Sequence, residues 1–61
     1  MFSSQLKNRR ILLVDDEQAL LDMAESILKE AGFENIKTAA TIREAVEITK
    51  SFLPELAVLD V

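Results

Sequence analysis

Apolar residues along the chain fall into two recurring patterns. Residues 11–14 (ILLV) and 56–59 (LAVL) are continuous apolar runs, whereas the apolar residues between about 20 and 31, and between 42 and 53, recur at intervals of three and four. Short continuous runs are typical of strands buried on both faces, and the three-and-four spacing is that of one helical face. With a weaker strand expected at residues 36–40, the pattern predicts the order strand, helix, strand, helix, strand.

The first helix is predicted over residues 18–31. Asp16 is a candidate N-cap, and Glu17 places a negative charge in the first turn. Glu25 and Lys29 are spaced to form an ion pair one turn apart, and Gly32 stands where a left-handed residue ends a helix. These signals bound the helix at both ends.

The second helix is predicted to begin at a capping box. Thr41 and Glu44 have the T-x-x-E spacing in which each side chain accepts a hydrogen bond from the backbone near the other residue. Pro54 cannot continue a helix, so the element ends before it. The apolar faces of both helices are expected to be core, and the Glu and Lys faces to be solvated. The expected core residues include Leu20, Met23, Ile27, Val46 and Phe52.

Strands that alternate with helices run parallel, and their crossover connections are right-handed. If the first helix leads to a strand on one side of residues 11–14, and the second helix leads back to a strand on the other side, the two helices cover opposite faces. The predicted fold class is therefore α/β, a βαβαβ unit of a doubly wound parallel sheet with strand order 2-1-3.

Composition limits the kinds of function that the chain can have. Its 61 residues make one small domain with 49% hydrophobic and 30% charged residues, so the core is small and support from a partner or from further chain is expected. It has neither Cys nor His, which excludes disulfides and disfavours zinc. The net charge of −4 argues against direct contact with nucleic acid. The leader, residues 1–9, is too short and polar for a signal peptide or a membrane span, so a cytoplasmic location is expected.

Both apolar runs end in carboxylates. Asp15 and Asp16 follow the run at residues 11–14, and Asp60 follows the run at residues 56–59. If the two strands are parallel neighbours, these carboxylates emerge at the same edge of the sheet, the edge where open α/β sheets bind ligands. A set of oxygen ligands favours a hard cation, Mg²⁺ or Mn²⁺. The alternative is that Asp16 caps a helix and Asp60 forms a turn.

The stretches ILLVDDE, AATIREAVE and PELAVLD closely resemble the receiver domain of two-component response regulators, over residues 10–61 and for the N-terminal half of a receiver. The resemblance implies a flavodoxin-like fold, with Asp60 as phosphoacceptor for a sensor histidine kinase. It also implies that Asp16 binds Mg²⁺ directly, that Asp15 does so directly or through a water, and that an output domain or effector acts downstream.

Other receiver features, a hydroxyl residue, a lysine and a switch aromatic, would lie beyond Val61, so impaired phosphorylation is expected for this chain alone. Two other functions remain open. A haloacid-dehalogenase-type phosphatase also has an aspartate nucleophile after its first strand, but that family requires D-x-D where this chain has DDE. The chain could also be an inert assembly module. Because the third strand would lack a neighbour on one side, self-association through its edge is expected.

Overall fold

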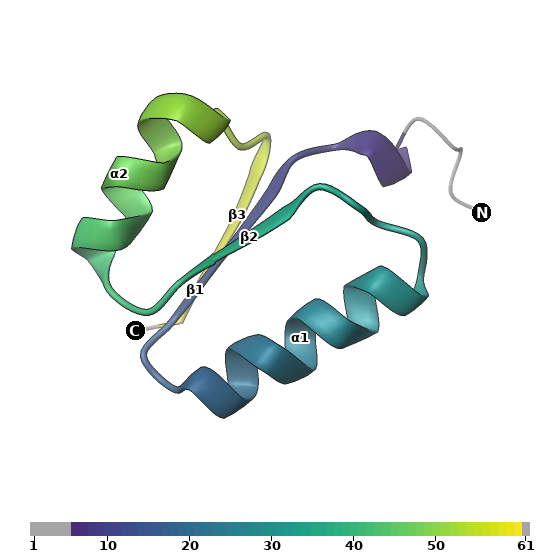
Figure 1. Cartoon of the computed structure of the whole chain (residues 1–61), viewed down its shortest axis with the longest axis horizontal. Coiled ribbons are helices and arrows are strands. Elements are labelled where there is room, and N and C mark those ends of the chain that lie inside the picture. The colour runs from purple at the N-terminus through teal and green to yellow at the C-terminus, as the bar shows by residue number, and fades with distance from the viewer. Residues whose placement is uncertain (1–5, 61) are drawn as a thin grey trace.

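A computed structural model describes residues 6–60 of the chain. After a short 3-10 helix, η1 (Leu6–Asn8), the elements follow the predicted order (Figure 1). They are β1 (Ile11–Asp15), α1 (Gln18–Glu30), β2 (Ile36–Ala39), α2 (Ile42–Phe52) and β3 (Leu56–Asp60). The predicted element types are confirmed; each element starts at the predicted residue and ends within one residue of the prediction.

The three strands form one parallel sheet in the order β2-β1-β3. β1 pairs with β2 from Ile11↔Ile36 to Val14↔Ala39, and with β3 along its whole length. The prediction of a doubly wound α/β unit with strand order 2-1-3 is therefore confirmed. β1 is the central strand.

The two helices cover opposite faces of the sheet (Figure 1). On the α1 face, Ile11 and Leu13 form a buried cluster with Leu21. On the α2 face, Leu12 and Val14 are buried with two alanines, Ala39 and Ala45. Successive residues of a strand point to opposite faces, so β1 supplies both halves of the core, and this requirement explains its uninterrupted apolar run.

The start of α1 differs from the prediction. The N-cap is Glu17, not Asp16, and its side chain makes no capping hydrogen bond. β1 extends through Asp15, and the Glu17 N–H donates to Asp15 Oδ1 at 2.9 Å. The carboxylate that follows the strand therefore satisfies a backbone donor at the helix entrance, and Asp16 lies exposed in the turn between the two elements.

The end of α1 and the start of α2 agree with their sequence signals. Gly32 has a φ of +104°, its N–H donates to the Lys29 carbonyl, and the Phe33 N–H donates to the Leu28 carbonyl. These two bonds form the Schellman motif. At α2, Thr41 Oγ1 accepts from the Glu44 N–H at 3.1 Å. The Glu44 carboxylate accepts from the N–H of Ala40 rather than from that of Thr41.

Fewer helix residues are buried in the core than the sequence predicted. Neither helix packs against β3, because α1 and α2 lie over β1 and β2. Four of the predicted core residues are therefore 40–60% exposed, namely Leu20, Met23, Ile27 and Val46, and Phe52 is only partly buried. All five residues of β3 are exposed as well, in contrast to the buried β1.

A cluster of charges joins the opposite, amino-terminal ends of β1 and β3. Glu55 forms ion pairs with Arg9 and Arg10, and the Arg10 Nε–H donates to the Leu53 carbonyl at 2.8 Å. The backbone N–H groups of Glu55 and Leu56 donate to the Arg10 carbonyl. The hydrogen bond from Arg9, supported by one from the Arg10 N–H, lowers the pKa of Glu55 from its ordinary value of 4.5. Arg9, the last residue of the predicted leader, therefore contacts the folded unit.

No helix within residues 6–60 has the length and apolar character needed to cross a membrane.

Candidate functional site

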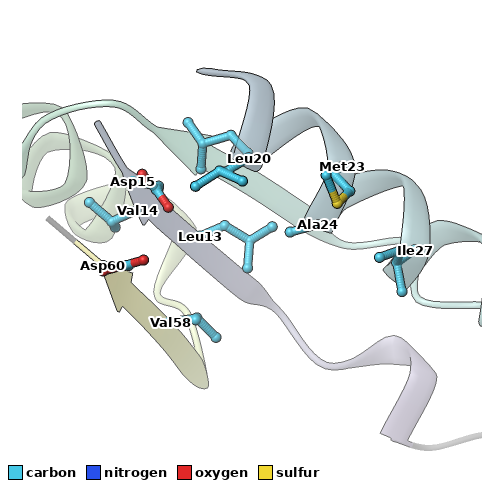
Figure 2. Close-up of a pocket in the computed structure, with 10 residues that line it drawn as sticks. Leu13, Val14, Asp15, Leu20, Met23, Ala24, Ile27, Val58 and Asp60 are labelled. Carbon is cyan, nitrogen blue, oxygen red and sulfur yellow. The ribbon is translucent and has the colours of Figure 1, made fainter. Parts of the chain in front are cut away.

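Asp15 and Asp60 lie side by side at the carboxyl ends of the two neighbouring strands (Figure 2). They are paired in the parallel register, with their backbones about 4.8 Å apart, the spacing of hydrogen-bonded strands. Residues paired in a parallel ladder point to the same face of the sheet, and both carboxylates line a cleft on the α1 face. The predicted meeting of these two residues at one edge of the sheet is present in the structure.

The two carboxylates have different surroundings. Asp15 is partly buried, and its Oδ1 accepts the hydrogen bond from the Glu17 N–H. Asp60 is exposed, and within residues 6–60 no hydrogen bond or ion pair reaches its side chain. Asp15 is thus held in one orientation by the backbone, whereas Asp60 is open to solvent.

Asp16 does not join them in a cluster. Among the described residues, no group of three or more acidic side chains is placed to hold a metal ion. The structure thus brings Asp15 and Asp60 together, and the part of Asp16 in holding a metal ion stays a prediction. Asp16 is exposed in the turn between β1 and α1. Carboxylates repel one another unless a cation neutralises them.

The donor set nevertheless suits a hard cation. Mg²⁺ prefers carboxylate oxygens and is commonly held by only one or two carboxylates, with water completing its octahedral shell. Asp15 and Asp60 supply two such groups on one face, and no Lys or Arg among residues 6–60 forms an ion pair with either of them. The negative charge at this edge is therefore not neutralised by the surrounding side chains.

The cleft beside the two carboxylates has a volume of about 320 Å³ and is mainly apolar. One wall is α1, which contributes Leu20, Met23 and Ile27, and Val58 lies on the opposite side (Figure 2). A second cleft of about 510 Å³ lies on the other face of the sheet, between α2 and β3, and includes Ile42, Val46 and Leu59. Neither cleft was predicted from the sequence. The only available signal was the continuous apolar run of residues 56–59, which indicates a strand that requires cover on both faces.

Comparisons with known proteins agree with this arrangement. The family model described as "Response regulator receiver domain" matches residues 11–61. The transcriptional regulatory protein YvrH of Bacillus subtilis is 43% identical over 56 residues, which are 92% of this chain and 24% of that protein. The transcriptional regulatory protein PdtaR of Mycobacterium tuberculosis is 39% identical over 54 residues, which are 87% of this chain and 26% of that protein.

The chemotaxis protein CheY of Thermotoga maritima is 36% identical over 53 residues, which are 87% of this chain and 44% of that protein. The chain therefore spans less than half the length of each of these three relatives. No solved structure matches the chain.

The family match covers most of the chain, including both strands that carry the paired carboxylates, and the observed sheet order is the one that the resemblance implied. Nothing in the comparisons favours a phosphatase. The chain belongs to the family of response regulator receiver domains.

Proposed function

We propose that Asp60 is the phosphoacceptor of this receiver sequence and takes a phosphoryl group from a sensor histidine kinase. The observation that supports this assignment most directly is the pairing of Asp60 with Asp15 at the carboxyl edge of the sheet, on one face. In open α/β sheets this edge is where ligands bind. The family membership supplies the reaction class, which is phosphorelay signalling.

The surroundings of the two carboxylates favour Asp60 over Asp15 as the nucleophile. A nucleophile must reach the phosphorus atom of a large donor, and Asp60 is exposed and free of hydrogen bonds within the described residues. Asp15 is partly buried, and its Oδ1 already accepts from the Glu17 N–H. Asp15 is therefore better suited to hold a cation than to act as the nucleophile toward phosphorus.

In the proposed transfer, a carboxylate oxygen of Asp60 forms a bond to phosphorus while the phosphorus–nitrogen bond of phosphohistidine breaks. The electron pair of that bond stays on the imidazole nitrogen, and the product on this chain is an aspartyl phosphate. Phosphoryl transfer requires positioning and charge neutralisation more than covalent chemistry from the protein. The chain acts here as a phosphoacceptor and not as an enzyme with a separate substrate.

Asp15 and Asp60 would hold Mg²⁺ or Mn²⁺, with Asp16 recruited from the adjoining turn when the cation neutralises the repulsion among the three carboxylates. The cation would neutralise the phosphoryl oxygens. Asp15 is already oriented for this role by its bond to the Glu17 N–H.

The proposed partners are the kinase and an output domain or effector. YvrH and PdtaR are named transcriptional regulatory proteins, which supports an output in transcription. The net charge of −4 supports the view that any contact with nucleic acid is made outside this segment. A cytoplasmic location stays a prediction. Self-association through β3 is a separate matter, because it depends on apolar surface and not on the carboxylates.

The assignment can be tested by treating the chain with acetyl phosphate in the presence and absence of Mg²⁺ and locating the label by mass spectrometry. We expect labelling on Asp60 that depends on Mg²⁺ and is lost in Asp60→Asn. Asp22→Asn is the matched control, because it makes the same substitution at an exposed carboxylate of α1. This control should be labelled as the parent is.

The other outcomes identify the alternatives. Label on Asp15 or Asp16 would instead support a nucleophile after the first strand, as in a phosphatase of the haloacid-dehalogenase type. A folded chain that takes up no label at any of the three residues would support the inert assembly module.

A further inference from the structure

The amino-terminal ends of β1 and β3 are joined by contacts that centre on Arg10 and Glu55. The Glu55 N–H donates to the Arg10 carbonyl at 2.8 Å, and the Arg10 N–H donates to Glu55 Oε1 at 3.2 Å. The two residues therefore bond to each other in both directions. Arg9 adds an ion pair with Glu55, and the Arg10 Nε–H donates to the Leu53 carbonyl. This end of the sheet is the one opposite the two paired carboxylates.

Arg10 and Glu55 occupy equivalent positions in the two strands. Each directly precedes the first residue pair of the ladder that joins β1 to β3. Asp15 and Asp60, which stand five residues later in each strand, form the last pair of that ladder. Because two paired strands advance by the same distance per residue, a contact that aligns Arg10 with Glu55 also aligns Asp15 with Asp60.

The apolar residues between these two pairs do not distinguish one register from another. β1 contributes ILLV and β3 contributes LAVL, so both faces of both strands are apolar at every position. An apolar pattern specifies register when one face of a strand is apolar and the other polar, and a strand with two similar faces lacks this information. Backbone hydrogen bonds form in any register. The polar residues at the two ends of the ladder therefore specify the alignment.

The two ends of the ladder have opposite electrostatics. At the carboxyl end, Asp15 and Asp60 repel each other unless a cation neutralises them. At the amino end, Arg9 and Arg10 attract Glu55. A slide of β3 by two residues keeps each side chain on its own face, moves Asp60 by roughly 6.6 Å along β1 and weakens the repulsion. The same slide separates Glu55 from Arg10, so the contacts at the amino end oppose it.

We propose that Glu55 is a positioning residue, which by its contacts with Arg9 and Arg10 fixes the register of β3 against β1. That register places Asp60 beside Asp15. The consequence for phosphoryl transfer rests on the proposed function of Asp60, whereas the alignment of the two carboxylates does not. Glu55 acts from the far end of the strand and is neither a ligand of the cation nor the nucleophile.

Glu55 acts on the carboxylate pair through the register and not through its charge. The five residues of strand that separate Glu55 from Asp60 span roughly 16 Å. This distance is about twice the Debye length at physiological ionic strength, so the field of Glu55 at the carboxylates is largely screened. The ion pairs of Glu55 are partly exposed and contribute little to overall stability. An effect of Glu55 on the carboxylate pair can therefore be separated from direct electrostatics and from general destabilisation.

NMR of Glu55→Lys tests the register directly and without a cation. This variant replaces the attraction at the amino end by repulsion from two arginines. Backbone NOEs between Asp15 and Asp60 should weaken, because part of the population leaves the aligned register. NOEs across the pairing of β1 with β2, such as those between Leu13 and Thr38, should be unchanged.

Two further variants separate the register from the charge. Glu34→Lys is the matched control, because it makes the same substitution at an exposed residue that lies just before β2, at the same end of the sheet, and forms no ion pair within residues 6–60. Its NOEs should match those of the parent. Arg9→Glu introduced into Glu55→Lys exchanges the two charges. Because Arg9 contacts Glu55 through its side chain, the exchange should recover part of the NOE intensity of the carboxylate pair.

Titration with Mg²⁺, followed through the amide signals of Asp15 and Asp60, gives a second readout. A cation held by both carboxylates binds the aligned register, so its apparent affinity falls with the population of that register. We expect Glu55→Lys to bind Mg²⁺ roughly threefold to tenfold more weakly than the parent. Glu34→Lys should bind as the parent does. If the parent itself binds no Mg²⁺, the NOEs alone decide.

Failure of this inference differs from failure of the proposed function. If Asp60 is not the phosphoacceptor, acetyl phosphate labels another residue or none in the parent, and the NOEs of Glu55→Lys still report the register. A folded Glu55→Lys whose carboxylate pair gives the NOEs of the parent would overturn the positioning role, whichever residue is labelled. Equal weakening in Glu34→Lys would also overturn it. If Glu55→Lys does not fold by circular dichroism, the same NOEs in Glu55→Gln, which removes the attraction without adding repulsion, decide the matter.

Discussion

β1 and β3 have similar sequences, but β1 is buried and β3 is exposed. Both have five residues, four apolar ones followed by an aspartate, and the two strands pair in register along their whole length. The apolar residues of β1 are 1–4% exposed, whereas Leu56, Val58 and Leu59 of β3 are 50–59% exposed. The difference shows that burial follows from position in the sheet and not from the apolar run itself. β1 is flanked by two strands and covered by two helices, whereas within residues 6–60 β3 has one neighbouring strand and no helix packed on it.

The largest expected effect of this difference concerns matched leucine truncations. Leu13→Ala removes a buried side chain of β1 and should lower the free energy of unfolding by about 2–5 kcal/mol, which is much of the stability of a small domain. Leu59→Ala removes the same atoms from an exposed position in β3 and should cost about 1 kcal/mol or less. Urea denaturation at low protein concentration measures both.

The stabilities of Leu13→Ala and Leu59→Ala at high protein concentration extend the comparison of β1 with β3. If a second copy covers β3, the cost of Leu59→Ala should rise as the chain associates, and the cost of Leu13→Ala should not. Equal losses for both variants in the dilute chain would show that β3 is covered in solution by something other than a second copy.

A smaller effect is expected at the two strand-end carboxylates. Asp15→Ala removes the acceptor of the 2.9 Å hydrogen bond from the Glu17 N–H and should destabilise the chain by about 1 kcal/mol. Asp60→Ala removes no hydrogen bond within the described residues, so its cost should be close to zero. Both variants remove the same repulsion between the two strand ends, so the difference between them isolates the hydrogen bond. Thermal unfolding of the two variants at one pH checks it, and equal stabilities would contradict a role for Asp15 at the start of α1.

The smallest effect concerns the charged contact that ties the amino ends of β1 and β3 together. Because the hydrogen bond from Arg9 lowers the pKa of Glu55, the ionised carboxylate is favoured in the folded chain. Its contribution is therefore fully present above the ordinary pKa of 4.5 and is lost as the pH falls through the lower pKa of the folded state. The groups are partly exposed, so the contribution is modest and weakens in high salt.

Glu55→Gln should remove the contribution of Glu55 to the pH dependence of stability and leave the contributions of the other groups unchanged. Glu34→Gln is the matched control, because Glu34 is exposed and makes no ion pair within residues 6–60. Urea denaturation between about pH 7 and about pH 3 measures the two variants against the parent. A steeper loss of stability in the parent than in Glu55→Gln is expected. Parallel curves for the parent and Glu55→Gln would show that the contact does not hold the strand ends together.

The order and type of the elements were predictable because their signals are local. The spacing of apolar residues, the capping pair Thr41 and Glu44, and Gly32 at the end of α1 each act within a few residues of chain. For the predicted strand order 2-1-3, the right-handed crossover rule placed the two helices on opposite faces of the sheet. That order in turn placed Asp15 beside Asp60, so two of the three candidate site residues could be brought together from the sequence alone.

Other features depended on what lies next to a residue in space. The apolar residues of α1 and α2 predicted a buried face, but Met23, Ile27 and Val46 project toward β3, where no element among residues 6–60 covers them. Asp16 had the sequence position of an N-cap. In the structure β1 extends one residue further than predicted, and Asp15 rather than Asp16 accepts a hydrogen bond from the Glu17 N–H.

The sequence by itself thus determined the elements, their order in the sheet and the pairing of Asp15 with Asp60, because periodicity and chain connectivity are properties of the chain alone. Only the tertiary structure decided which of two equivalent apolar strands is buried and which carboxylate remains open. Burial and hydrogen bonding are set by neighbours that are distant along the chain. Within the part of the chain that the structure describes, β1 has such neighbours on both sides and both faces, and β3 has them on one side.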